Sequence, residues 1–273
     1  MLLSGPPGAG KTMLARRLPG ILPPLSDDDA LEVASIRSLS GGAVDVLGRD
    51  APLEAPHHST SVAALVGGGS RAARPGAIVR AHRGVLFLDE AAEFSRVALD
   101  ALRQPLEAGS IDILRAGFTV RFPARFQLVL ATNPCPCGQY GVRGGDCTCV
   151  PMAIRRYASR ISGPLRDRLD IELHIARAST GDVTSGQRGG TTSDDARQRE
   201  RVARERARSR WAGTPWSTNA DVPGSWLRRP EHRLSTEARA PLDRALERGA
   251  LTLRGYDRVL RIAWTMADLN GID

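Results

Sequence analysis

The sequence is poor in lysine, aromatic residues and long apolar runs. Of its 38 basic residues only Lys11 is a lysine, and aromatic residues make up 4% of the 273 residues. No apolar run approaches the roughly 20 residues that a membrane-spanning helix needs. The start Met1-Leu2-Leu3 is too short for the core of a signal peptide. These absences exclude a membrane or secreted protein and predict a cytoplasmic one.

The composition is otherwise that of a globular protein with an excess of positive charge. Hydrophobic residues account for 41% and charged residues for 25% of the chain, and the formal net charge is +8. At roughly 150 residues per domain, the length allows one large domain or two modest ones. The positive charge permits a nucleic-acid partner without requiring one.

The segment Gly5-Pro6-Pro7-Gly8-Ala9-Gly10-Lys11-Thr12 satisfies the phosphate-loop pattern G-x-x-x-x-G-K-[ST]. The pattern requires a strand before it and a helix after it. Residues 1–4 are typical of the end of a buried strand, and residues 12–18 of a helix. In such a loop the backbone N–H groups bind phosphates, Lys11 holds the β- and γ-phosphates, and Thr12 ligates Mg²⁺. The segment predicts binding of ATP and Mg²⁺; the alternative is a chance glycine and proline turn.

Two further apolar segments end in polar residues that suit the same chemistry. Gly84-Val85-Leu86-Phe87-Leu88-Asp89-Glu90 predicts a strand buried on both faces of a parallel sheet, with its acids at the ligand-binding end. Asp89 would hold Mg²⁺ and Glu90 would orient and polarise the attacking water; alternatively they are surface acids at a helix start. Residues 126–131 predict a third strand, and the amide of Asn133 after it would reach the γ-phosphate.

The order of these motifs resembles that of the AAA+ ATPases. Further strings narrow the resemblance to the magnesium-chelatase-like group and, within it, to the ComM/YifB competence-protein family. These strings are Ala55-Pro56-His57-His58-Ser59-Thr60-Ser61 with Gly67-Gly68-Gly69, Pro123-Ala124-Arg125-Phe126-Gln127-Leu128, Arg160-Ile161-Ser162-Gly163-Pro164-Leu165-Arg166-Asp167-Arg168-Leu169-Asp170, and Leu253-Arg254-Gly255-Tyr256. The resemblance implies an α/β fold, with a parallel sheet covered by helices on both faces and a small α-helical lid domain after it.

The resemblance also implies how the chain is divided. Its parts are an AAA+ P-loop core at 1–178 with an insertion near 54–76 and a β-hairpin near 111–122, a linker at 179–193, and a helical lid domain at 194–273. In the family's ring, the insertion and the hairpin face the central pore. There Arg115 and Arg121 would contact a nucleic-acid backbone; ordinary solvated hairpin positions are the equal alternative.

Two arginines take roles from their positions in the family. Arg168 corresponds to the arginine finger that reaches the nucleotide of a neighbouring subunit, which implies a homo-oligomeric ring, a hexamer. Arg254 corresponds to the second sensor arginine at the start of a lid helix. From the residues alone, Arg168 is a surface arginine paired with Asp167 or Asp170, and Arg254 is one of many exposed arginines.

All four cysteines lie in one short stretch, as Cys135-Pro136-Cys137 and Cys147-Thr148-Cys149. Disulfides are disfavoured in the cytoplasm, so clustered thiols predict a tetrahedral structural Zn²⁺ site that braces the loop after Asn133. The C-x-C spacing is tighter than the usual C-x₂-C, and free thiols or disulfides are the alternatives. His57 and His58 show no ligand spacing and are interpreted as packing or pore residues.

An arginine-rich helix is predicted after the linker. Seven arginines fall between residues 197 and 210, with few apolar residues among them. A solvated helix is therefore the first interpretation. Trp211, Trp216 and Trp226 follow closely, and arginine beside aromatic surface binds single-stranded nucleic acid by stacking in other proteins, which is the alternative.

The function that the resemblance implies is ATP hydrolysis that drives DNA translocation or branch migration, as in transformation or recombination. A second hypothesis is the motor subunit of a magnesium-chelatase-like metal-insertion complex. The chain begins almost at its phosphate loop, and compared with the family it is expected to be truncated at its N-terminus. A non-hydrolysing ATP-binding fragment is therefore the third hypothesis.

Overall fold

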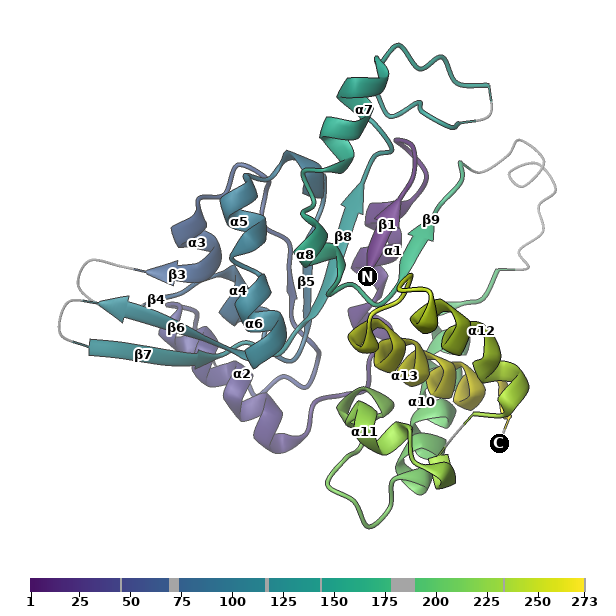
Figure 1. Cartoon of the computed structure of the whole chain (residues 1–273). Coiled ribbons are helices and arrows are strands. Elements are labelled where there is room, and N and C mark those ends of the chain that lie inside the picture. Colours follow the sequence, from purple (N-terminus) through teal and green to yellow (C-terminus); the bar gives the residue numbers. More distant parts are fainter. Residues whose placement is uncertain are drawn as a thin grey trace. The chain divides into compact units, whose positions relative to one another are not determined.

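The computed structural model describes residues 1–44, 46–68, 74–115, 118–142, 144–177, 190–232 and 234–272 (Figure 1). The chain divides into two compact units, Met1–Gly190 and Thr191–Asp273. The predicted linker at 179–193 lies mostly outside the described residues. No helix in the described part is long and apolar enough to cross a membrane.

The first unit is built on a parallel sheet of five strands in the order β2-β5-β8-β1-β9. The strands are β1 (Leu2–Ser4), β2 (Leu53–Glu54), β5 (Val85–Leu88), β8 (Gln127–Thr132) and β9 (Glu172–His174). All four residues of β5 are buried, as its apolar run predicts for a strand covered on both faces. The predicted α/β fold with a parallel sheet is confirmed.

Alternate residues of the strands pack into two separate apolar clusters, one on each face of the sheet. Leu2, Leu86 and Leu130 belong to the larger cluster, which includes residues of α2, α3, α4, α5 and α8. Leu3 and Phe87 belong to the smaller cluster, against α1. This alternation places successive side chains on opposite faces. The helices of the first unit are α1 (Lys11–Arg17), α2 (Asp27–Leu39), α3 (Val62–Val66), α4 (Ala77–Arg80), α5 (Arg96–Asp100), α6 (Arg103–Ala108), α7 (Pro151–Ala158) and α8 (Gly163–Arg166), with the 3-10 turns η1 (Pro19–Ile21) and η2 (Ala91–Glu93).

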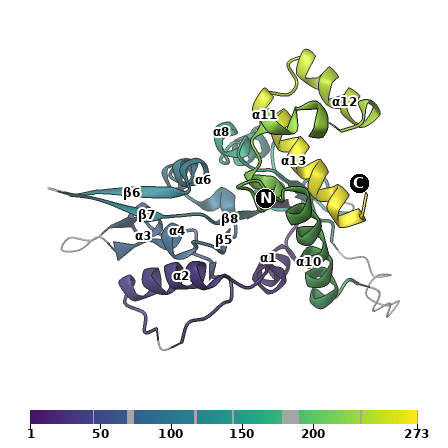
Figure 2. The same cartoon turned by 90° about the horizontal axis from the view of Figure 1, so that it is seen from below.

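Two small antiparallel pairs lie outside the main sheet. β3 (Gly67–Gly68) pairs with β4 (Arg74–Pro75), and β6 (Ser110–Arg115) pairs with β7 (Phe118–Pro123). Figure 2 shows β6 and β7 as an extended hairpin. Arg121 on this hairpin donates to both carboxylate oxygens of Asp112 at 2.7 and 3.1 Å, a solvated cross-strand ion pair. The side chain of Arg115 lies outside the described residues.

The second unit is helical, with α10 (Ser193–Arg210), α11 (Gly224–Leu227), α12 (Thr236–Glu247) and α13 (Leu253–Asn270), and the 3-10 turns η3 (Asn219–Asp221) and η4 (Pro230–His232). The Thr192 hydroxyl and the Asp195 carboxylate cap the start of α10 reciprocally. Arg210 on the last turn of α10 pairs with Asp268 of α13, which is 1% exposed. Asn219 also donates to Asp268 at 2.8 Å.

The tryptophans form the core of this second unit. Trp211 is 1% exposed and its indole N–H donates to Asn219 at 2.9 Å. Trp216 and Trp264 pack edge-on against it, and Trp226 packs edge-on against Trp216. Trp211 is therefore not available to stack on single-stranded nucleic acid, whereas Trp216 and Trp226 are half-buried and the hypothesis stays a prediction for them.

Candidate nucleotide-binding site

Three loops meet at the carboxyl ends of neighbouring strands of the first unit (Figure 1). Residues 5–10 follow β1, Asp89 and Glu90 follow β5, and Asn133 follows β8. Because β8 lies between β5 and β1, groups that are far apart in sequence converge at one edge. This edge is where ligands bind in open parallel sheets.

Lys11 lies at the centre of this convergence. Its residue is 8% exposed, and its Nζ donates to the carbonyl oxygens of Gly5 at 2.6 Å and Pro6 at 2.9 Å, and to Asn133 Oδ1 at 3.1 Å. Burial lowers the pKa of the Lys11 ammonium, and the charge of Asp89 opposes that shift. A cation held by weak neutral acceptors is suited to exchange them for phosphate oxygens.

Thr12 and Asp89 bring two oxygen ligands together. The Thr12 hydroxyl donates to Asp89 Oδ2 at 2.7 Å, and Asp89 Oδ1 accepts the backbone N–H of Glu90 at 2.9 Å. A hydroxyl beside a carboxylate fits Mg²⁺, which takes one or two protein oxygens and completes its shell with water and phosphate. The donor set present therefore fits the predicted Mg²⁺ ion.

Glu90 has a strained backbone and an exposed carboxylate. Its φ of 50° lies in the left-handed region, which costs a residue other than glycine about 1–3 kcal/mol. The side chain is 56% exposed, and Oε2 lies 3.2 Å from Nδ1 of His58. The carboxylate of Glu90 is thus accessible to solvent beside His58.

The contact between His58 and Glu90 was missed by the sequence interpretation, which treated His57 and His58 as packing or pore residues. The ring centroids of His57 and His58 lie 4.0 Å apart, and His57 Nδ1 lies 2.8 Å from the Ser59 hydroxyl. His58 follows β2, which pairs with β5. Residues after β2 therefore lie beside those after β5, so recognising the two-residue strand β2 would have predicted the contact.

Arg168 is held within its own unit, just beyond α8. Its side chain is 12% exposed, and its Nη atoms donate to Glu107 of α6 and to the Pro164 carbonyl oxygen, each at 2.5 Å. Its Nε is buried without a hydrogen-bond partner. Arg254 lies in the second unit, in the first turn of α13, which Thr252 caps.

The structure also gathers the four cysteines. Their sulfur atoms all lie within 4.8 Å of one another, in the loop between Asn133 and α7. Cys135 is buried and the other three are half-buried. The predicted ligand set for zinc is thus brought together next to the nucleotide-binding edge.

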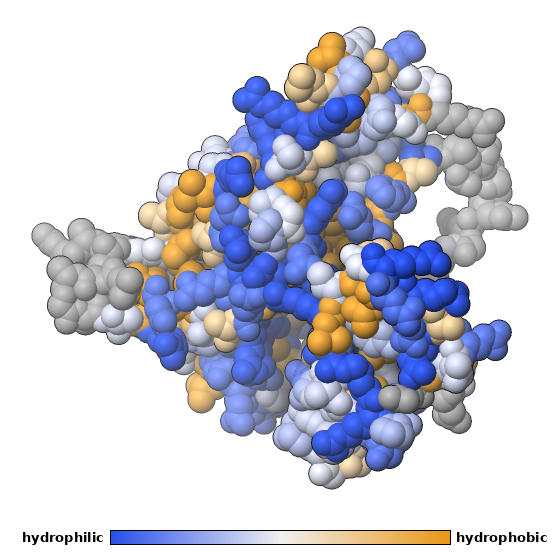
Figure 3. All heavy atoms as spheres, viewed as in Figure 1, coloured by the Kyte–Doolittle hydropathy of each residue, from blue (hydrophilic) through white to orange (hydrophobic). Residues whose placement is uncertain are grey.

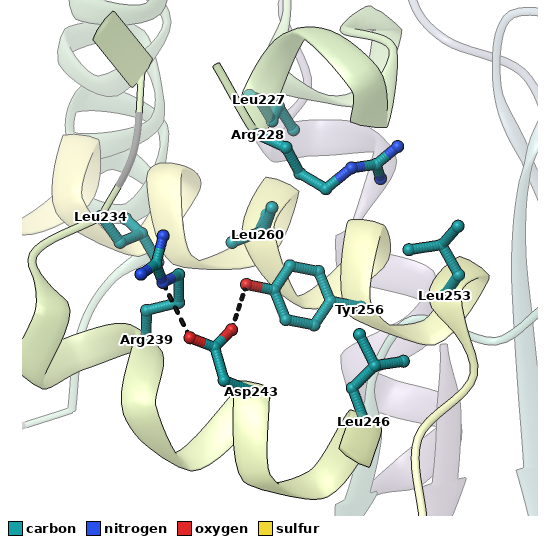
Figure 4. A pocket seen from close by; sticks show the side chains of 9 residues that line it. All are labelled: Leu227, Arg228, Leu234, Arg239, Asp243, Leu246, Leu253, Tyr256 and Leu260. Atoms are coloured by element: carbon teal, nitrogen blue, oxygen red, sulfur yellow. Dashed lines mark hydrogen bonds and ion pairs between the residues drawn. The ribbon is translucent and has the colours of Figure 1, made fainter. Parts of the chain in front are cut away.

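A cavity of about 310 Å³ lies in the second unit between α11, α12 and α13 (Figure 4). Tyr256 of the Leu253-Arg254-Gly255-Tyr256 string donates to Asp243 at 2.7 Å, and Arg239 donates to the other oxygen of Asp243 at 2.9 Å. Tyr256 is buried, so this part of the string stabilises the contact between α12 and α13.

The fold and the arrangement of the loops define the class as P-loop proteins with an AAA+ α/β fold. The chain belongs to the family described as magnesium chelatase, subunit ChlI, whose model matches residues 1–183, and the model of the ChlI C-terminal region matches residues 190–273.

Several curated proteins are similar to the chain. It is 52% identical over 274 residues to an uncharacterized protein of Mycobacterium tuberculosis, covering 99% of this chain and 53% of the relative. It is 43% identical over 272 residues to competence protein ComM of Haemophilus influenzae, covering 99% of this chain and 52% of that protein. It is 28% identical over 199 residues to the magnesium-chelatase 67 kDa subunit of Heliobacterium mobile, covering 62% of this chain and 28% of that subunit. The chain thus spans about half the length of the first two relatives.

Proposed function

We propose that this chain is an ATP-hydrolysing motor domain whose site is formed by Lys11, Thr12, Asp89, Glu90 and Asn133. The observation that carries the proposal is the convergence of these side chains at one sheet edge, with Lys11 bonded to Asn133 and Thr12 bonded to Asp89. Backbone N–H groups of residues 8–12 bind the phosphates. Thr12 and Asp89 would hold Mg²⁺, which would supply positive charge to neutralise the charge that develops on the phosphates.

The chemistry follows from the positions of these groups. Lys11 exchanges its carbonyl acceptors for oxygens of the β- and γ-phosphates. Glu90 orients a water molecule and accepts its proton as the water oxygen bonds to the γ-phosphorus and the bond to the bridging oxygen of the β-phosphate breaks. Asn133 holds the γ-phosphate, and His58 orients the carboxylate of Glu90.

The proposal includes a homo-oligomeric ring, a hexamer, in which Arg168 acts on the nucleotide of the neighbouring subunit. The AAA+ fold supports it. In the single chain Arg168 pairs with Glu107, so ring assembly has to exchange that ion pair for contact with phosphate. Arg254 acts as the second sensor in this proposal.

DNA is the proposed substrate on which the motor works, by translocation or branch migration. The likeness to a competence protein and the net charge of +8 support this choice. The second candidate is a motor subunit of a metal-insertion complex, which the ChlI family model and the likeness to a magnesium-chelatase subunit support.

Steady-state ATP turnover by the purified chain tests the proposal, with and without single-stranded DNA and beside Glu90→Gln. Turnover that rises with DNA and falls about 10²- to 10⁴-fold in the variant supports the DNA motor. Turnover indifferent to DNA favours the metal-insertion motor. Absence of turnover above the variant overturns hydrolysis by this chain and leaves an ATP-binding fragment.

A further inference from the structure

The four cysteine sulfurs form a cluster with the dimensions of a tetrahedral metal site. The sulfur atoms of Cys135 and Cys137 are 3.4 Å apart. The sulfur of Cys147 lies 3.8 Å from that of Cys135 and 3.7 Å from that of Cys137. Four Zn–S bonds of about 2.3 Å at tetrahedral angles separate the sulfurs by about 3.8 Å, whereas a disulfide bond measures about 2.05 Å. None of the four cysteines is joined in a disulfide bond.

A backbone N–H group donates to one of these sulfurs. The N–H of Tyr140 lies 3.3 Å from Cys135 Sγ. Similar bonds orient the ligands of protein metal sites. The backbone of the loop therefore helps to hold Cys135 Sγ in the cluster.

The tight C-x-C spacing suits the local backbone. Residues 145–150 form no helix, and along them Cys147 and Cys149 are half-buried while Thr148 between them is exposed. Residues two apart on an extended chain face the same side. The first pair lies on a turn closed by the Gly138 N–H, which donates to the Cys135 carbonyl oxygen at 3.0 Å.

We propose that this cluster binds one structural Zn²⁺ ion through four thiolates, and that the ion holds the loop at 135–149 against the phosphate loop. A closed tetrahedral set of four thiolates is a typical ligand set of structural zinc sites. The second half of the proposal, the link to nucleotide binding, rests on the proposed function.

Direct contact supports the link. At Gly138, whose φ is +77°, an added Cβ would lie 2.5 Å from Pro7 Cδ and 3.9 Å from Asn133 Cγ. Residues 140–142 line a cavity of about 460 Å³, to which Gly5 and Pro6 also contribute. The cysteine loop thus touches the phosphate loop and the residue that bonds Lys11, and a metal that fixes the loop also fixes one side of the nucleotide site.

The metal is tested by elemental analysis of the purified full chain, together with a count of reactive thiols. We expect one zinc per chain in the wild type, loss of zinc in Cys147→Ser, and retention in the matched control Thr148→Ser. Four reactive thiols without metal, two disulfides, or iron in place of zinc would overturn the assignment. Reversible removal from the wild type with a zinc chelator keeps the test valid should Cys147→Ser fail to fold.

The link is tested by the affinity of a fluorescent ATP analogue for the loaded, stripped and zinc-reloaded chain. We expect stripping to weaken binding by about fivefold or more and reloading to restore it. Gly138→Ala is expected to weaken binding while zinc is retained. Equal affinity of the loaded and stripped chains overturns the link but not the zinc site. Failure of the loaded chain to bind the analogue counts against the proposed function instead, while the zinc count stands.

Discussion

At the scale of single residues, Lys11 has surroundings that arginine cannot share. Its ammonium is a compact charge bonded to three acceptors in a site where the residue is 8% exposed. A guanidinium is planar and larger, with its donors in a rigid fork. Every other basic residue in the chain is arginine, so size and shape, and not charge alone, distinguish this position.

We therefore predict that Lys11→Arg weakens ATP binding by about 10- to 100-fold, the size of one lost charge-assisted contact. The reciprocal control is Arg16→Lys, an exposed position on the same helix, which should leave the affinity unchanged. Titration with a fluorescent ATP analogue measures both. Affinity of Lys11→Arg within twofold of the wild type would contradict the argument from shape.

His58 and Glu90 form the second contact that matters at this scale. Because His58 Nδ1 lies 3.2 Å from the Glu90 carboxylate, His58→Ala should lower kcat about 10- to 100-fold by misplacing that carboxylate. The KM for ATP should change little, because His58 does not hold phosphate. His58→Asn, which keeps a side-chain donor, should recover part of kcat.

The matched control for this prediction is His57→Ala. His57 bonds Ser59 and not Glu90, so its loss should alter kcat less than twofold. Steady-state kinetics over a range of ATP concentrations separates kcat from KM in all three variants. A kcat for His58→Ala equal to that of the wild type would show that Glu90 needs no partner.

At the scale of elements, His82 joins three segments of the first unit. Its Nε2 lies 2.9 Å from Glu32 of α2, and its Nδ1 accepts the backbone N–H of Arg125, just before β8, at 3.0 Å. Burial is the main reason that its pKa is lowered; Arg83 lowers it further, while Glu32 and Asp29 raise it. The residue is 1% exposed, so the imidazole is buried and neutral.

This pKa shift has a defined sign in stability. The unfolded chain takes up a proton on His82 below about pH 6.5, while the folded chain resists it, so stability falls as the pH falls through this range. The hydrogen bond from His82 lowers the pKa of Glu32, which adds a loss of the same sign at lower pH.

We predict that His82→Ala lowers the free energy of unfolding by about 1–3 kcal/mol at pH 7, because it leaves buried partners unpaired. The variant should also lose part of the dependence on pH between 7 and 5. Chemical denaturation at these two pH values measures both effects. The control is His174→Ala on the exposed edge strand β9. If the pH dependence of the free energy of unfolding is the same in His82→Ala as in the wild type, other titratable groups cause that dependence.

Some elements of the first unit can be predicted from a few contiguous residues, and others cannot. The phosphate loop, β5 and β8 follow from contiguous residues, since glycine spacing and four-residue apolar runs act locally. Strand β2 has only two residues, and no period marks it. Only its second residue, Glu54, falls within the predicted insertion at 54–76, and its pairing with β5 emerged only from the sheet.

Some apolar residues on the short helices of the first unit are exposed on its surface. In Figure 3 hydrophilic residues cover much of this face, and apolar ones show between them near α3 and α5. Val97 at the start of α5 is 66% exposed. The sequence of such a short helix does not predict which valine is exposed and which is buried. Five residues complete little more than one turn, which is too short to show a helical pattern of apolar residues.

At the scale of the whole molecule, the chain has two units with separate cores. The polar centre of the second is Asp268, which is 1% exposed and contacts Arg210 and Asn219. Removal of one partner of a buried ion pair leaves an unpaired charge, which costs about 3–5 kcal/mol. Loss of this contact should therefore affect one unit selectively.

We predict that Asp268→Ala unfolds the second unit at a lower denaturant concentration and leaves the first unit folded. Limited proteolysis with identification of the fragments reports each unit separately. Glu247→Ala, at an exposed position on α12, is the control. Simultaneous loss of both units in Asp268→Ala would show that they unfold as one.

The sequence by itself predicted the phosphate loop, the acidic pair and the asparagine as parts of one site, because each motif is a short contiguous run. It also predicted the parallel sheet and the ligand set of four cysteines. Tertiary structure alone decided which distant residues meet: His58 with Glu90, Arg168 with Glu107, and the cysteine loop with Pro7. It also buried Trp211. These contacts depend on strand order and packing, and no local period along the chain records which loops end up side by side.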